Sequence, residues 1–179
     1  MGEDIAELRA IKDEVEIKCI EKAGEKAKRA IEKALDNAKL GISETEIAAE
    51  AYDVLYKMGS EEPLVYVNAG PNPRVHAEPL STVRVKDGTT VTIVIAADHL
   101  RYYANKSETV LVGSRSGIAL NAMETMGKVH SLAAELTEPG VKLIDVMKEI
   151  DRVYAERKLI DLRVVGYTHG VGLLIEEPR

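Results

Sequence analysis

The strongest constraint on the fold of this chain is an apolar repeat with steps of three and four residues that follows Asp13. This spacing places apolar side chains on one face of an α-helix, while Lys and Glu occupy the other faces. Asp13 can cap the helix, because Glu16 stands three residues later as in a capping box, and Gly41 supplies the stop. The repeated positions are Ile17, Ile20, Gly24, Ala27, Ile31, Ala34 and Ala38. The pattern predicts a long amphipathic helix.

A second helix is predicted soon after the first. Ser43 can cap it, while the side chain of Glu46 reaches back to the Ser43 backbone in the same box arrangement. The helix is expected to end at Gly59. Its buried stripe consists of Ile47, Ala51, Leu55 and Met58. The two helices are therefore expected to form a pair.

The pattern then changes from helical to extended. A short strand is predicted at 64–68, and the following loop at 69–73 contains Gly and Pro, which forbid regular structure. The nearly unbroken apolar run at 91–97 predicts a strand that is covered on both faces. A turn at 98–101 leads to another strand at 102–112, so these two strands should form a hairpin.

Helical periodicity returns at 117–136, breaks at a Pro-Gly pair, and resumes at 142–157. A last strand is predicted at 162–166. The order helix, helix, hairpin, helix, helix, strand is typical of the α+β class. Because 179 residues is the length of one domain, we predict a single domain over 1–179.

Composition and charge argue against several classes of protein. Hydrophobic residues make up 45% of the chain, yet no stretch approaches the ~20 apolar residues that a membrane span needs. The net charge is −6, with basic and acidic residues interleaved, which argues against a nucleic-acid partner. The first ten residues carry acids and lack the apolar core of a secretory signal, so a cytoplasmic protein is expected. The single cysteine, Cys19, lies within the helical pattern and is expected to be buried.

The common catalytic signatures are missing from the sequence. There is no Cys-x-x-Cys, no His-Glu-x-x-His and no phosphate loop, and Arg115 stands where a nucleophile elbow requires serine. What stands out instead is an ordered set of short segments. These are Gly-Pro-Asn at 70–72 followed by His76, the strand end Glu-Thr-Val-Leu-Val-Gly at 108–113, and the glycine-rich segment that begins at His169.

This ordered set resembles the pita-bread peptidases, a family that includes methionine aminopeptidase, Xaa-Pro dipeptidase and creatinase. The segment 8–17 is similar to the start of the catalytic domain in Xaa-Pro peptidases. The loop leading to His76 resembles the loop with the family's substrate-side histidine, and 85–88 resembles the turn into its first metal-bearing strand. The resemblance implies an α+β pita-bread fold, whose carboxy-terminal part is expected to be missing after Arg179.

The resemblance also implies where metal ligands should stand. The family holds two divalent metals with two aspartates eleven residues apart, a histidine and two late glutamates, since adjacent dications need anionic bridging oxygens. Here the aspartate positions fall on Val94 and Asn105, and the histidine position falls on His169. A second family histidine, which assists the tetrahedral centre, falls on Glu176, and the glutamates would lie beyond Arg179. Because valine has no lone pair and asparagine offers a neutral oxygen, no metal or other cofactor is expected.

The remaining polar residues each have a structural interpretation beside a functional one. His169 is expected to be a relic whose ring bonds to neighbouring backbone. His76 either contacts a ligand at the mouth of a cleft or is an ordinary residue of a surface loop. His99 and His130 are expected to be structural or solvated. Glu176 and Glu177 are expected to be solvated charges, with Glu176 kept as a candidate cleft residue.

The resulting hypothesis is a metal-site-deficient homologue of the aminopeptidases and Xaa-Pro dipeptidases that binds a peptide or protein without hydrolysing it. The alternatives are an active metallopeptidase, a metal-free creatinase-like hydrolase in which His76 transfers the proton, and a fragment of a longer peptidase. An incomplete sheet would expose a strand edge, so a homodimer is a further expectation. Neither nucleic acid nor a membrane is expected as a partner.

Overall fold

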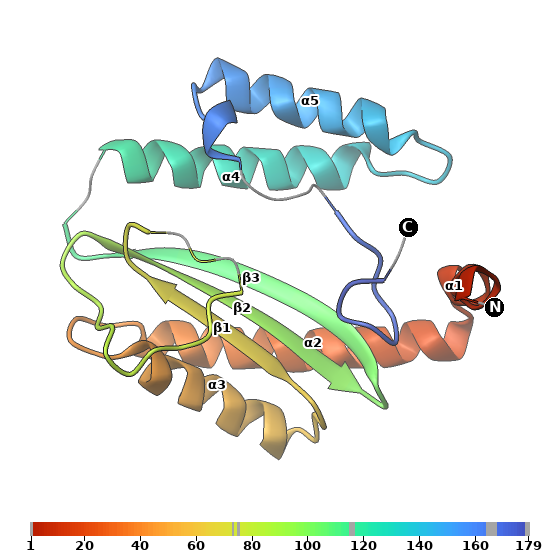
Figure 1. Ribbon diagram of the computed structural model, residues 1–179, viewed down its shortest axis with the longest axis horizontal. Helices are drawn as coiled ribbons and strands as arrows, with labels where there is room; N and C mark the ends of the chain where they lie inside the picture. The colour runs from red at the N-terminus through yellow and green to blue at the C-terminus, as the bar shows by residue number, and fades with distance from the viewer. Residues whose placement is uncertain (1, 73, 75, 115–116, 164–167, 178–179) are drawn as a thin grey trace. The chain divides into compact units, whose positions relative to one another are not determined.

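A computed structural model describes the chain except for residues 1, 73, 75, 115–116, 164–167 and 178–179 (Figure 1). Contacts between its residues divide the chain into two compact units. Unit 1 comprises Met1–Ser114 and His169–Arg179, and unit 2 comprises Arg115–Thr168. That the two units act as a single domain over 1–179 stays a prediction.

Most of the regular elements match those expected from the sequence. The described part of unit 1 contains α1 (Gly2–Ala10), α2 (Glu14–Asn37), α3 (Glu44–Lys57), β1 (Leu64–Ala69), β2 (Thr89–His99) and β3 (Tyr102–Val112). The described part of unit 2 contains α4 (Gly117–Leu136), α5 (Leu143–Glu156) and the 3₁₀ helix η1 (Ile160–Leu162). The bounds of β3 and α4 are those predicted. Helix α1 was not predicted, because its few apolar residues do not follow a helical repeat.

Both predicted capping boxes are confirmed. The Asp13 carboxylate accepts a hydrogen bond from the Glu16 backbone N–H at 2.9 Å, and the Asp13 N–H donates to the Glu16 side chain at 2.8 Å. Ser43 and Glu46 exchange the corresponding pair of bonds at the start of α3. Each box satisfies backbone N–H groups that have no partner within the helix, and so determines where the helix begins.

The core of unit 1 lies between the helix pair α2–α3 and one face of an antiparallel sheet with the strand order β1-β2-β3 (Figure 1). Helix α2 packs against β2 and β3, and α3 packs against β1. The largest fully buried aliphatic side chains are Ile31, Ile47, Leu55, Val65, Val67, Val91, Ile93 and Ile95. Burial of these side chains is the main source of stability for the unit.

The prediction that the strand at 91–97 is covered on both faces was wrong for part of its length. Val91, Ile93 and Ile95 point toward the helices and are 0% exposed, whereas Thr92 and Val94 on the other face are only half-buried. Side chains alternate between the faces of a strand, so α2 and α3 can cover only every second residue. Val94 is apolar although it faces away from the helices.

The β2–β3 hairpin has a tighter connection than the predicted turn at 98–101. Leu100 and Arg101 form its two-residue loop, with φ values of 51° and 70°. Positive φ at both residues is typical of a type I′ turn, which matches the twist of the flanking strands. Arg101 also forms an ion pair with Glu62, which lies just before β1.

The predicted strand at 162–166 is not observed in the residues that can be checked. Leu162 belongs to the 3₁₀ helix η1, and 164–166 lie outside the described residues. A short apolar run has no periodicity that separates a strand from a tight helical turn, which explains the error.

Unit 2 is a helical hairpin. Val129 of α4 packs against Val146 and Ile150 of α5 in a small apolar cluster. Lys142 precedes α5 without forming a side-chain cap. Among the helices in the described part of the chain, none is both long enough and apolar enough to cross a membrane.

The contact between Asp87, just before β2, and Ser114, just after β3, should make the stability of the protein depend on pH. The Asp87 carboxylate accepts hydrogen bonds from the Ser114 hydroxyl at 2.6 Å and the Ser114 N–H at 2.8 Å, and these bonds lower the pKa of Asp87. A depressed pKa in the folded state contributes stability above the ordinary value of 3.8, and this contribution is lost as the pH falls through the lower folded value. In urea unfolding at a series of acidic pH values, the stability of Asp87→Asn should therefore decrease less steeply with falling pH than the stability of the unmodified protein.

The exposed carboxylate of Asp36 on α2 provides a control for this measurement. Asp36→Asn removes the same charge without removing the contact to Ser114. Equal acid slopes for Asp87→Asn and the unmodified protein would contradict the prediction.

Candidate functional site

The residues of interest lie on the face of the sheet that α2 and α3 leave uncovered, called here the open face. The strand register aligns Tyr66 of β1 with Val94 of β2, and Val94 with Ser107 of β3. Directly opposed residues in antiparallel strands project to the same side, so these three side chains form a row across the open face.

Val94 and Asn105 are diagonal neighbours on this face. Asn105 is opposite Ala96, two residues along β2 from Val94, while Val94 is opposite Ser107. Diagonal neighbours on one face of a sheet are within reach of each other's side chains. The structure therefore brings together the two positions that the resemblance assigns to metal-bridging aspartates.

The segment 169–177 lies against the edge of β3 near the same face. The Tyr103 N–H donates to the Gly172 carbonyl at 2.7 Å, and the Asn105 side-chain amide donates to the Ile175 carbonyl at 2.9 Å. Within the segment, Gly170 and Glu177 form an antiparallel bridge. These contacts carry His169 and Glu176 to the edge of the sheet that bears Asn105.

His169 is exposed, and its ring contacts the backbone. Its Nδ1 atom lies 2.8 Å from the carbonyl oxygen of Gly170, a distance at which a protonated Nδ1 donates a hydrogen bond. Glu176 is also exposed. This ring–backbone contact is the one expected for His169, while its role as a relic of a metal site stays a prediction.

The expectation that Glu177 is a solvated charge was wrong. Glu177 is only 6% exposed, and its carboxylate pairs with Arg9 of α1 at 2.5 Å and accepts from the Leu174 N–H at 3.1 Å. A Cβ atom on Gly172 would lie 2.8 Å from Glu177 Oε1, so a larger residue there would force the Glu177 side chain to shift. Glu177 therefore joins the end of the described chain to α1.

His76 lies above the open face, stacked on Tyr66. The two ring centroids are 5.5 Å apart and the rings are 16° from parallel. His76 has a φ of 55°, in the left-handed region that few side chains adopt without support. Burial raises the pKa of Tyr66, and the charges of Glu78 and Glu176 raise it further.

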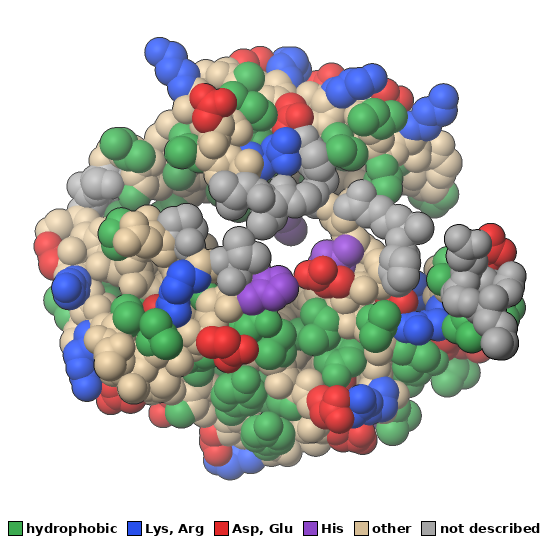
Figure 2. Space-filling model, viewed as in Figure 1, with side chains coloured by type: hydrophobic (Ala, Val, Ile, Leu, Met, Phe, Trp, Pro, Cys, Tyr) green, Lys and Arg blue, Asp and Glu red, His purple; other side chains and the backbone are tan. Residues whose placement is uncertain are grey.

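The open face therefore collects most of the candidate residues. Tyr66, Val94 and Asn105 belong to it, His76 stacks on Tyr66, and the charge of Glu176 contributes to the raised pKa of Tyr66. Figure 2 shows histidine and acidic side chains close together on the drawn face of the molecule. The open face therefore presents the stacked rings of His76 and Tyr66, the Glu176 carboxylate, and the side chains of Val94 and Asn105.

The other histidines and the cysteine lie elsewhere. His99 is at the end of β2, where burial and the nearby charges of Lys26 and Lys22 lower its pKa. His130 is exposed on α4 in unit 2, and Cys19 is buried in α2 as expected. Within unit 1, His99 and Cys19 therefore take no part in the open face.

Sequence reasoning missed several buried charged residues. Lys26, Glu44 and Asp98 are 5%, 0% and 0% exposed. A signal for Lys26 was present, because it stands three residues after Ala23 and four before Ala30, both fully buried on α2. For Glu44 and Asp98 the sequence contained no such signal, since their partners come from distant segments.

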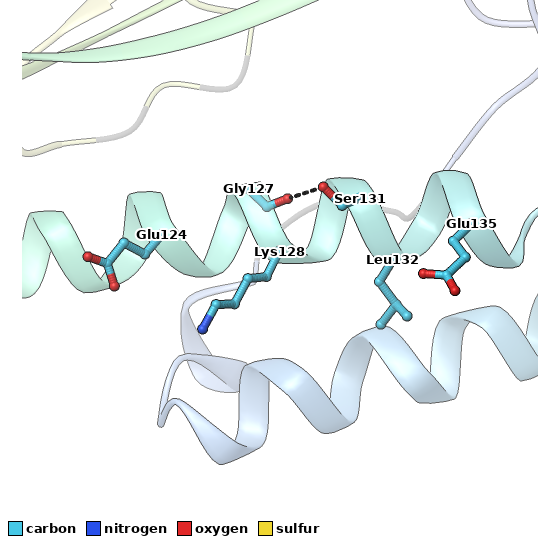
Figure 3. Close-up of a pocket in the computed structure, with 6 residues that line it drawn as sticks. All are labelled: Glu124, Gly127, Lys128, Ser131, Leu132 and Glu135. Atoms are coloured by element: carbon cyan, nitrogen blue, oxygen red, sulfur yellow. Dashed lines mark hydrogen bonds between the residues drawn. The ribbon is translucent and has the colours of Figure 1, made fainter.

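A shallow groove on unit 2 is a weaker candidate for a site. It follows one side of α4, where the Ser131 hydroxyl donates to the Gly127 carbonyl at 3.1 Å (Figure 3). Its lining residues are Glu124, Gly127, Lys128, Ser131, Leu132 and Glu135. Among the described residues of the whole chain, no three His, Cys, Asp or Glu side chains are grouped closely enough to hold a metal ion.

An antiparallel sheet backed by a capped helix pair agrees with the pita-bread peptidase class that the sequence resembles. The sequence profile of Metallopeptidase family M24 matches residues 18–179. The chain therefore belongs to Metallopeptidase family M24.

Known relatives and structures agree with this assignment. The chain is 29% identical over 178 residues to the Xaa-Pro dipeptidase of Pyrococcus furiosus, a match that covers 97% of this chain and 50% of that protein. It is 33% identical over 73 residues to the creatinase of a Bacillus species, covering 41% of this chain and 18% of the creatinase. The prolidase structure from Pyrococcus horikoshii superposes with a TM-score of 0.91 at 28% identity, over 99% of this chain and 52% of the prolidase.

The expected fold is confirmed by these similarities. The chain has the pita-bread fold of the prolidases over the part that it shares with them. It spans about half the length of the dipeptidase and prolidase to which it is similar.

Proposed function

We propose that this chain is a metal-site-deficient homologue of the Xaa-Pro dipeptidases that binds a peptide or protein at the open face without hydrolysing it by a two-metal mechanism. The observation that carries the proposal is the pair Val94 and Asn105, diagonal neighbours at the assigned aspartate positions. A homodimer remains a further prediction, which light scattering of the purified chain would check.

The donor groups at these positions do not fit a pair of adjacent dications. Val94 has no donor atom, and Asn105 offers one neutral oxygen while its amide nitrogen is bonded to Ile175. Two adjacent dications need anionic oxygens to neutralise their charge, and hydrocarbon beside a neutral amide supplies none. The histidine position, His169, contributes a single neutral ligand at most.

The groups that remain on the open face suit binding of a peptide. The stacked rings of His76 and Tyr66 offer an aromatic surface, and Glu176 offers an acceptor for backbone or ammonium N–H groups. Strand β3 already donates one backbone hydrogen bond to the segment 169–177, from the Tyr103 N–H to the Gly172 carbonyl. A bound peptide would contact these groups through packing and hydrogen bonds, with no reaction required.

The metal content and peptidase activity of purified, untagged protein test the first part of the proposal. After incubation with Mn²⁺, Co²⁺ or Zn²⁺ and removal of free metal, elemental analysis should find far less than two equivalents per chain. Neither the dipeptide Ala-Pro nor the tripeptide Met-Ala-Ser should be hydrolysed. Stoichiometric dinuclear metal together with turnover of either peptide would end the proposal.

Peptide affinity tests the second part. Titration of Ala-Pro and Met-Ala-Ser into isotopically labelled protein should shift signals of the open face, and His76→Ala should weaken this binding by about tenfold because a main contact is lost. His130→Ala, in an exposed position on α4, is the matched control and should leave the affinity unchanged. Equal affinities for the two variants would contradict the assignment.

A metal-free, creatinase-like hydrolase is the second candidate. It is supported by the similarity to creatinase and by the exposed position of His76 next to Tyr66. Under this alternative, the purified protein would hydrolyse creatine without added metal, and His76→Ala would abolish the reaction. Absence of turnover in the unmodified protein would remove this candidate.

A further inference from the structure

One buried carboxylate holds both ends of the loop that carries His76. Glu44, in the first turn of α3, is 0% exposed, and its carboxylate accepts from the Ala69 N–H at 2.7 Å and the Leu80 N–H at 2.9 Å. The same carboxylate accepts from Nη2 of Arg74 at 2.5 and 2.6 Å. Glu44 therefore ties the beginning, the middle and the end of the loop 69–80 to one point on the helix.

Arg74 uses most of its hydrogen-bonding capacity inside this loop. Its Nε atom donates to the Asn68 side chain at 3.1 Å, and Nη1 donates to the Glu78 carbonyl at 3.0 Å. Nη2 also contacts the Val67 carbonyl at 3.1 Å. A lysine could not reproduce these bonds, because only the planar guanidinium presents donors in several fixed directions.

This pairing satisfies the electrostatic requirements of a buried acid. A carboxylate without solvent is stable only when it is paired and hydrogen-bonded, and Glu44 receives two backbone N–H groups as well as a cation. The loop cannot move away from α3 without leaving Glu44 unpaired. The network therefore resists displacement of the loop.

His76 lies between two anchored points of this loop. On one side is Arg74, and on the other the Ala77 carbonyl accepts from the Val67 N–H at 3.0 Å. The left-handed backbone of His76 is unfavourable by itself and persists where its surroundings impose it. Anchors on both sides supply that constraint and hold the ring against Tyr66.

We infer that Glu44 and Arg74 are positioning residues, which fix the 69–80 loop so that His76 is presented over the open face in a conformation ready to contact a peptide. The inference deepens the proposed function and rests on it for the role of His76 in binding. The effect of the ion pair on the position of the ring can be measured without any ligand.

The test compares Arg74→Lys and Glu44→Gln with a matched control, Arg84→Lys. Arg84 forms an exposed ion pair at 3.2 Å with Glu46, in the same turn of α3 as Glu44. The first readout is the chemical shift of the His76 ring protons, which depends on stacking against Tyr66. The second readout is the affinity for Ala-Pro and Met-Ala-Ser.

Arg74→Lys and Glu44→Gln should move the His76 ring signals toward those of an unstacked histidine and weaken peptide binding by about tenfold, while Arg84→Lys changes neither. If Glu44→Gln fails to fold, Arg74→Lys decides the question, because it keeps the charge opposite Glu44.

Unchanged ring signals in a folded Arg74→Lys variant would overturn the inference. If the unmodified protein binds neither peptide, the proposed function fails, while the ring signals still decide whether the ion pair positions His76.

Discussion

Ile93→Ala is expected to lower the free energy of unfolding by about 2–5 kcal/mol, whereas Val94→Ala, one residue further along β2, should lower it by only about 1 kcal/mol. Ile93 is 0% exposed and packs between the sheet and the helix pair, so its truncation leaves a cavity. Val94 is half-buried on the open face, where solvent can replace the removed methyl groups.

Urea unfolding followed by circular dichroism measures both losses under the same conditions. The adjacent positions have similar backbone environments and belong to the same strand, so each variant is the control for the other. Equal losses would show that the open face is as fully packed as the core. A fully packed face would leave no room for a peptide at the candidate site.

Lys26→Met is expected to lower the free energy of unfolding by about 1.5–3 kcal/mol, the range for hydrogen bonds to charged groups. The Lys26 ammonium donates to the carbonyl oxygens of Gly59 and Asp98, both at 2.8 Å. Methionine fills the same space but has no N–H to donate, so the buried Asp98 carbonyl loses its bond to Lys26, while the Gly59 carbonyl lies in an exposed residue. The substitution also removes the positive charge of Lys26, which lies near the buried carboxylate of Asp98.

The comparison for this prediction is Lys33→Met. Lys33 lies on the same helix in an exposed ion pair with Glu50 at 3.2 Å, and its removal should cost less than about 1 kcal/mol. Burial lowers the pKa of Lys26, an effect that the charge of Asp98 partly offsets. A Lys26→Met protein as stable as Lys33→Met would show that the buried contacts contribute little.

The two faces of the sheet are expected to contribute unequally to stability. The helix-covered face and the Lys26 contacts are expected to determine whether the chain folds, and under the proposed function the open face determines what it binds. Substitution of the exposed His76 should therefore affect binding more than stability. This separation allows the proposed function to be tested in variants that remain folded.

Local sequence signals predicted the elements that depend on neighbouring residues. The capping boxes at Asp13 and Ser43 were identified because donor and acceptor stand three residues apart. Strand β3 and helix α4 were predicted with the observed bounds, because their patterns extend over many residues. At Leu162, where the predicted strand 162–166 was to begin, the structure has η1, because so short a run does not distinguish a strand from a tight helical turn.

The candidate site was predictable in its positions and less so in its contacts. The family resemblance selected Val94 and Asn105, and the strand register places them diagonally on one face. The burial of Glu177 was not predictable, because its partner Arg9 stands 168 residues earlier. The same reason hid Glu44, whose partners lie 25 to 36 residues away.

Sequence information alone was sufficient for the α+β class, the family resemblance and the starts of α2 and α3, and it shows no acidic side chain at positions 94 and 105. These follow from residue identity and from spacings within a few turns of chain. Tertiary structure decided which face of β2 stays open, which charges are buried and how His76 is held. Each of these depends on contacts between residues that are far apart in the sequence and come together only when the chain packs. Local sequence patterns contain no information about such contacts.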